Sequence, residues 1–133
     1  MNDSLRVVMV KSFYIGIGGF LGANARYWLG GWVIDRLGES FPHATFAVNV
    51  IGSFVLGLFV TLTTERYIVS HPNVRLLVAI GLIGSFTTFS TFEYETFALA
   101  NTGSYWLAGL NACLSLTAGF VAVWLGARLA LFL

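Results

Sequence analysis

The chain has 133 residues, of which 57% are hydrophobic and only 10% charged, and its mean hydropathy is +0.82. Soluble globular proteins carry about a quarter charged residues, so this composition excludes an ordinary soluble domain and indicates a membrane protein. A formal net charge of +1 with no basic tail gives no reason to expect a nucleic-acid partner.

The apolar residues fall into four segments, each long enough to cross a membrane as a helix. A hydrocarbon core of about 30 Å needs roughly 20 apolar residues in helical form. We place the spans near residues 13–37, 45–64, 74–100 and 105–132. The alternating segments of ~10 residues that are typical of outer-membrane barrels are not found. The sequence therefore predicts an all-α membrane protein with one four-helix domain, residues 1–133.

The first span contains a glycine step and a charge. Gly18 and Gly22 form a G-x-x-x-G step, which is typical of close helix packing in lipid. A charge at mid-helix costs ~2.5 to 3.5 kcal/mol, so Arg26 is expected to face protein or water unless it reaches the interface. The small residues at 23–25 mimic a signal-peptide cleavage site, but the apolar run continues past them as RYWLGGWVI, which favours a retained span.

The second span carries one amide, Asn49, in the run FAVNVIGSF. An Asn side chain at membrane depth can hold neighbouring helices together, and its two N–H donors can instead solvate an anion. The residue type alone favours helix packing and leaves the second role open.

The third span is too long for an unbroken, untilted helix. Residues 74–100 would extend about 40 Å at 1.5 Å per residue. Glycine loosens a helix and hydroxyls compete for its hydrogen bonds, so the run GSFTT favours a break between about Gly84 and Thr88. A broken span exposes main-chain groups, which are tolerated at membrane depth only where protein, water or an ion satisfies them.

Aromatic and polar residues follow this break. Phe89 and Phe92 are three residues apart and share a helix face, where they are either ordinary packing residues or ring edges that line a path for a small anion. Glu93 and Glu95 are candidates for the interfacial end of this half-helix. Single Cys and isolated His residues give no disulfide framework and no metal-ligand spacing; they are Cys113, His43 and His71.

Three stretches together resemble one known family. The run GSFTTFSTFEYE at 84–95, GGFLGANARY in the first span and FAVNVIGSFVLG in the second resemble the Fluc family of fluoride channels, also called CrcB proteins. The likeness extends from Gly18 to Arg128. The run G-x-x-T-T-F-S-T-F is highly specific in combination with the upstream Asn, whereas each piece alone would be weak.

The resemblance implies a passive channel in the inner (plasma) membrane that passes fluoride and selects against chloride. It implies an antiparallel, dual-topology homodimer with two pores. It also implies a structural sodium ion at the dimer centre, bound by the main-chain carbonyls of Gly84 and Thr87 from both subunits.

The resemblance further assigns roles to matching side chains. Phe89 and Phe92 would turn ring edges toward fluoride, and Asn49 would donate a hydrogen bond to it. Arg26 would lie near the vestibule. A polar track would line the rest of the path, formed by Ser90, Thr91, Glu95 and Ser115.

Two features depart from the family pattern. Where relatives often carry Tyr and then Ser in the fourth span, this chain has Asn111, keeps Ser115 and has Gly119. The Lys and Arg count also favours one orientation, with both termini inside, although an antiparallel dimer needs both orientations. The residues on the terminal side are Arg6, Lys11, Arg66, Arg75 and Arg128, against Arg36 alone on the other.

Two other functions remain open beside the channel. A proton-coupled small-ion exporter of the dual-topology type needs an ionisable carboxylate deep in the bilayer, for which Glu93 and Glu95 are the candidates. The chain could also be a non-transporting subunit of a larger complex. An enzyme is not expected, because no constellation of nucleophile, base and metal ligands is visible.

Overall fold

The computed structural model describes residues 2–65 and 71–133, and these residues form helices without any strand. Four helical segments in this part of the chain are long and apolar enough to cross a membrane. They are α1 (Asp3–Leu37), α2 (His43–Thr64), a composite third segment (Pro72–Asn101) and α6 (Tyr105–Phe132). The prediction of an all-α, four-span protein is confirmed. Arg66 of the charge count lies outside the described residues.

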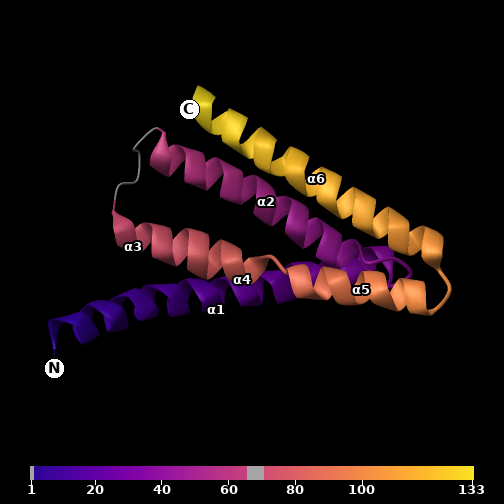
Figure 1. Ribbon diagram of the computed structural model, residues 1–133, viewed down its shortest axis with the longest axis horizontal. Helices are drawn as coiled ribbons and strands as arrows, with labels where there is room; N and C mark the ends of the chain where they lie inside the picture. Colours follow the sequence, from indigo (N-terminus) through magenta and orange to yellow (C-terminus); the bar gives the residue numbers. More distant parts are fainter. Residues whose placement is uncertain (1, 66–70) are drawn as a thin grey trace.

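The first helix begins at Asp3, ten residues before the predicted span. It has 35 residues, about 52 Å at 1.5 Å per residue, so it is much longer than a hydrocarbon core is thick. No Gly or Pro interrupts residues 3–13, and Asp3 lies in the first turn, where a negative charge favours a helix start. The N-terminal part therefore extends beyond the other helices (Figure 1).

The third segment is a composite of four helices. It runs through α3 (Pro72–Arg75), the π-helix η1 (Leu76–Ile83), α4 (Gly84–Phe86) and α5 (Phe89–Asn101). Between α4 and α5 the backbone is extended, with ψ 158° at Thr87 and φ −149°, ψ 110° at Thr88. The predicted break is confirmed, but only its last two residues leave the helix. The π-helix before it was not predicted.

Glycine contacts join the helices in two close pairs, α1 with η1 and α2 with α6 (Figure 1). A methyl group at Gly18 or Gly22 would collide with the η1 main chain at Leu77 or Leu82. On the other pair, Gly57 and Gly126 abut the main chain at Val123 and Phe54. Small residues allow helices to approach closely in lipid, so the predicted packing role of Gly18 and Gly22 is confirmed.

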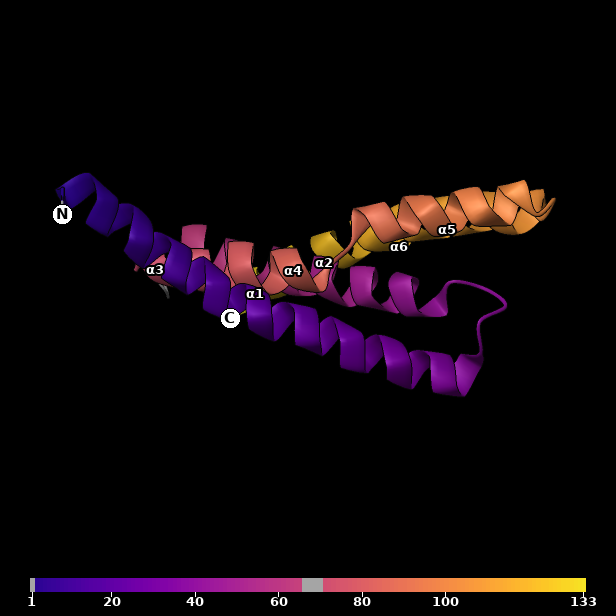
Figure 2. The same cartoon turned by 90° about the horizontal axis from the view of Figure 1, so that it is seen from below.

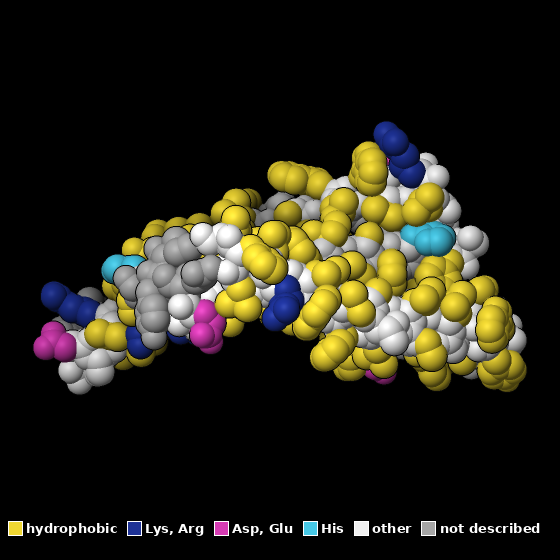
Figure 3. Space-filling model, turned by 90° about the horizontal axis from the view of Figure 1, so that it is seen from above, with side chains coloured by type: hydrophobic (Ala, Val, Ile, Leu, Met, Phe, Trp, Pro, Cys, Tyr) yellow, Lys and Arg dark blue, Asp and Glu magenta, His cyan; other side chains and the backbone are white. Residues whose placement is uncertain are grey.

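The bundle opens at the end where α1 finishes. Past the break, α5 follows α6 and diverges from α1, with the first turns of α2 between them (Figures 1 and 2). Both termini lie at the opposite end of the molecule (Figure 1). Hydrophobic side chains cover most of the face in Figure 3, as expected for a surface in contact with lipid.

Candidate ion pathway

The break in the third segment is closed by a side chain from α2. Asn49 Nδ2 donates to the carbonyl oxygen of Thr88 at 3.0 Å, and Thr88 N–H donates to Asn49 Oδ1 at 2.8 Å. The carboxamide thus pairs with the Thr88 main chain as a neighbouring peptide group would. This geometry agrees with the helix-packing role predicted for Asn49. One N–H of the carboxamide is left, because Nδ2 has two hydrogens.

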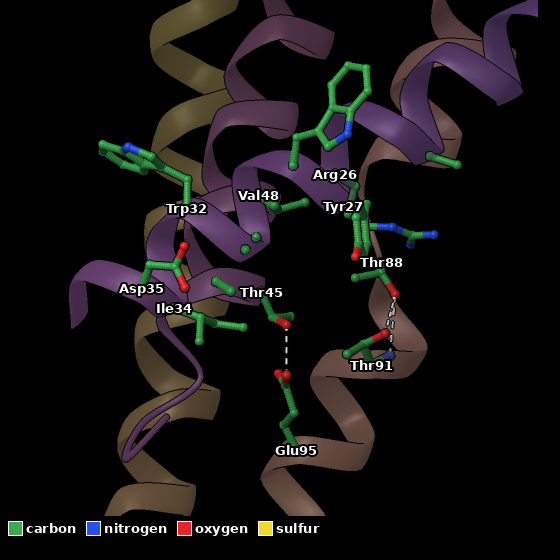
Figure 4. A pocket seen from close by; sticks show the side chains of 15 residues that line it. Arg26, Tyr27, Trp32, Ile34, Asp35, Thr45, Val48, Thr88, Thr91 and Glu95 are labelled. Carbon is green, nitrogen blue, oxygen red and sulfur yellow. Dashed lines mark hydrogen bonds between the residues drawn. The ribbon is translucent and has the colours of Figure 1, made fainter. Parts of the chain in front are cut away.

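A large pocket lies beside this contact, and we name it the Glu95 pocket. It has a volume of about 880 Å³ and is lined by α1, α2, Thr88 and α5, including Thr91 and Glu95. Thr45 Oγ1 donates to Glu95 Oε1 at 2.9 Å, while Thr88 and Thr91 share a hydroxyl hydrogen bond of 2.8 Å (Figure 4). The pocket therefore has a polar wall in an otherwise apolar protein.

Two charged side chains of the Glu95 pocket have unusual surroundings. Glu95 Oε2 is buried and has no hydrogen-bond partner among the described residues. Arg26 also lines the pocket, but its guanidinium points away from the Glu95 carboxylate (Figure 4). Its position agrees with the prediction that Arg26 faces protein or water.

A smaller pocket lies on the other side of the break, and we name it the Phe92 pocket. Its volume is about 240 Å³, and its lining includes Asn49, Thr87, Phe89, Phe92 and Ser115. The two phenylalanine rings have centroids 5.7 Å apart and an interplanar angle of 45°. An amide, hydroxyls and aromatic rings therefore meet in one small space.

The predicted pathway residues thus form two groups on different faces of α5. Thr91 and Glu95 line the Glu95 pocket with Arg26. Asn49 lines the Phe92 pocket together with Phe89, Phe92 and Ser115. Ser90 is exposed and lines neither pocket. The hydrogen-bonded pair Asn49–Thr88 has one member in each lining, Thr88 in the Glu95 pocket and Asn49 in the Phe92 pocket.

Two main-chain oxygens at the break accept no hydrogen bond from the described residues. Among the hydrogen bonds of the described residues, none ends on the carbonyl oxygen of Gly84 or of Thr87. Gly84 is exposed and Thr87 is half-buried. These are the two residues predicted to hold a cation, and uncompensated carbonyl dipoles at membrane depth fit that chemistry.

The comparison with known proteins now decides the family. A family model described as "CrcB-like protein, Camphor Resistance (CrcB)" matches residues 13–127. The chain belongs to the CrcB-like family. The resemblance recognised in the sequence is confirmed.

Three relatives of this CrcB-like chain match it over nearly their whole length. A protein of Solibacter usitatus named "Fluoride-specific ion channel FluC" is 46% identical over 121 residues, which cover 91% of this chain and 98% of the relative. Proteins of the same name from Geotalea daltonii and Acidobacterium capsulatum are 45% and 47% identical, over 89% and 88% of this chain and 94% and 93% of their own. This CrcB-like chain is a multi-pass membrane protein.

Two polar residues of the CrcB-like chain, Thr45 and Thr96, were not predicted from the sequence. Thr45 bonds Glu95, and it precedes Asn49 by four residues on α2, so helical spacing could have placed it on the same face. Thr96 was not singled out. It accepts a hydrogen bond of 2.8 Å from Asn111, a residue noted in the sequence only as a departure from the family pattern.

Proposed function

We propose that the protein is a passive, fluoride-selective channel of the plasma membrane that lets cytoplasmic fluoride leave the cell down its electrochemical gradient. The observation that carries this proposal is the likeness, over about nine tenths of the chain, to proteins named as fluoride-specific ion channels. Hydrogen fluoride enters cells as a neutral acid and dissociates inside. A leak for the anion therefore lowers its accumulation and its toxicity.

The Phe92 pocket offers the chemistry that a small anion needs. Fluoride is strongly hydrated, so a selective path replaces its water with donors at close range. The remaining N–H of Asn49, the hydroxyl of Ser115 and the positive ring edges of Phe89 and Phe92 are such donors. None of them carries a full positive charge that would trap the ion.

The Glu95 pocket is the proposed vestibule. Its volume of about 880 Å³ is several times that of the Phe92 pocket, and Arg26 supplies a positive charge that favours entry of an anion. Thr91 and Glu95 provide the polar wall. Ser90 is exposed, so its place on the path requires a second subunit.

The complete channel is proposed to be an antiparallel homodimer with sodium at its centre. Two helix breaks that meet on a two-fold axis would present four carbonyl oxygens, those of Gly84 and Thr87 from each subunit. Sodium is a hard cation that takes oxygen ligands, and these carbonyls accept no hydrogen bond from the described residues. The bound ion would neutralise the converging dipoles.

An efflux measurement tests the function. Purified protein is reconstituted in liposomes loaded with fluoride or with chloride, and the release of each ion is recorded with an ion-selective electrode. The proposal predicts rapid fluoride release and very little chloride release. Comparable release of both ions, or release of neither, would overturn it. No release from a purified, intact dimer would favour a non-transporting subunit.

The unpartnered oxygen of Glu95 keeps the proton-coupled exporter as a second candidate, because an exporter needs a carboxylate that exchanges protons at membrane depth. Glu95→Gln retains an acceptor for Thr45 and removes the ionisable group. A passive channel still conducts fluoride in this variant, although the lost charge in the vestibule changes the rate, and its flux does not follow an imposed proton gradient. An exporter stops. Glu93→Gln, at an exposed position two residues away, is the matched control.

A further inference from the structure

A buried amide links α6 to α5 beside the Phe92 pocket. Asn111 is only 1% exposed and is one of the largest fully buried side chains among the described residues. A carboxamide in this apolar setting needs hydrogen-bond partners, because an unsatisfied polar group is costly at membrane depth. Its partners therefore indicate why the chain carries it.

One partner, Ser115, lines the Phe92 pocket, and the other, Thr96, bonds the main chain of Phe92, which also lines it. Asn111 Nδ2 donates to Thr96 Oγ1 at 2.8 Å, and Thr96 Oγ1 donates to the carbonyl oxygen of Phe92 at 2.8 Å. On the other side, Ser115 Oγ donates to Asn111 Oδ1 at 3.4 Å. One chain of hydrogen bonds thus runs from Ser115 on α6 to the main chain of Phe92 on α5.

The three bonds differ in strength. The Asn111–Thr96 bond of 2.8 Å joins α6 to α5, and the Thr96–Phe92 bond of 2.8 Å lies within α5. The Ser115–Asn111 bond of 3.4 Å is long for a hydroxyl donor. The Ser115 hydroxyl has a single hydrogen, and in this bond it is donated to Asn111 and not to the pocket. An anion in the pocket can therefore draw this hydrogen away by breaking only the weakest bond.

We propose that Asn111 is a positioning residue that sets the separation of Phe92 and Ser115 and the direction of the Ser115 hydroxyl, and so determines how well the pore distinguishes fluoride from larger anions. Asn111 does not line the Phe92 pocket, so it acts through its neighbours. The inference rests on the proposed channel function. It assigns a role to a position at which the chain departs from the family pattern.

The test compares fluoride and chloride efflux from liposomes for matched variants. Asn111→Leu keeps the approximate size of the side chain and removes all its hydrogen bonds. We expect the ratio of fluoride to chloride efflux to fall about tenfold, the effect of losing one buried hydrogen bond. An unchanged ratio in a variant that still conducts fluoride would overturn the inference. A wild-type protein without fluoride selectivity would overturn the proposed function instead.

Variants at Thr96 keep the inference testable if Asn111→Leu does not assemble as a dimer. Thr96→Val removes the hydroxyl and keeps the shape, so the ratio should fall as in Asn111→Leu, while Thr96→Ser should preserve it. Because both residues belong to one link, the double variant Asn111→Leu with Thr96→Val should fall no further than either single one. Independent, additive falls would contradict a shared link.

A control separates this link from hydroxyl loss in general. Thr117 lies on α6, is exposed, and donates to its own helix at the carbonyl oxygen of Cys113, 2.6 Å away. Thr117→Val should leave the efflux ratio unchanged. An equal fall in this variant would show that the ratio does not depend on the Asn111 link, and the inference would fail.

Discussion

The rings of Phe89 and Phe92 contact each other at a tilt, with centroids 5.7 Å apart, yet Phe92 is 6% exposed and Phe89 is 68% exposed. Phe92 therefore contributes to the packing of the protein, whereas Phe89 contributes little. Truncation of a buried aromatic ring costs about 3–5 kcal/mol, whereas an exposed ring contributes little to packing. We expect Phe89→Ala to lower fluoride efflux without a change in thermal stability, and Phe92→Ala to lower both.

The double variant Phe89→Ala with Phe92→Ala is expected to abolish fluoride efflux while the dimer persists. Efflux from liposomes and unfolding followed by circular dichroism in detergent measure the two effects. Phe97→Ala, at an exposed ring on the same helix that lines neither pocket, is the control. Full efflux in the double variant would show that both rings serve only in packing and are not needed for fluoride transport.

The contact between Asn49 and the Thr88 main chain predicts a loss of both stability and transport in Asn49→Leu. The substitution leaves the N–H and the carbonyl oxygen of the half-buried Thr88 without partners, at a cost of up to about 1–3 kcal/mol for each unsatisfied group. Thermal unfolding and fluoride efflux are the measurements. Asn101→Leu, which removes an exposed amide at the end of α5, should change neither. A fully stable Asn49→Leu protein would show that the break does not depend on this side chain.

The close contact of α1 with η1 predicts that Gly22→Ala prevents assembly. Its new methyl group would meet the main chain of Leu82, which cannot move aside as a flexible side chain could. Gly16 lies on the same helix, and a methyl group there would have no atom within 4 Å. Size-exclusion chromatography should therefore show a normal dimer for Gly16→Ala and aggregate or no protein for Gly22→Ala. Equal behaviour of the two variants would contradict the packing derived for Gly22.

Removal of sodium is expected to weaken the dimer. If the carbonyls of Gly84 and Thr87 bind this ion from both subunits, exchange into sodium-free buffer with a bulky organic cation leaves four unsatisfied dipoles at the interface. The dimer peak in size-exclusion chromatography should then shift toward monomer and return when sodium is added. A dimer that is indifferent to sodium would argue against these carbonyls as ligands.

The features of the fold that depend on one segment alone could be predicted from the sequence. Span length predicted four helices, and the competition of hydroxyls with the main chain predicted a break ending at Thr88. The sequence could not predict that Gly81 and Gly84 stay helical, because that depends on a partner: Gly81 packs against the main chain of Ile15 and Gly18 on α1. The low helix propensity of glycine favours a break at either position. At Gly81 the contact with α1 outweighs that propensity and the residue stays helical.

The sequence predicted which residues belong to the candidate site, but not how they divide between the two pockets. Asn49, Phe92 and Glu95 are conspicuous in an apolar chain, yet the division into two pockets follows from which face of α5 each residue occupies after the break. The rotation of α5 about its own axis is set by the dihedral angles of the two extended residues, Thr87 and Thr88, which the sequence does not specify. The partners Thr45 and Thr96 were missed because a hydroxyl in a helix ordinarily bonds its own main chain.

The closure of the break by Asn49 also bears on the order in which the protein is made. The second span leaves the ribosome before the third, so Asn49 is already in the bilayer when the segment containing Thr88 arrives. Without that side chain, the open main-chain groups at Thr88 would face hydrocarbon, where each costs several kcal/mol. The break in the third segment is thus stable only when this segment is docked on α2. The kink in this span is therefore favoured by the hydroxyls of its own sequence and stabilised by a side chain of another helix.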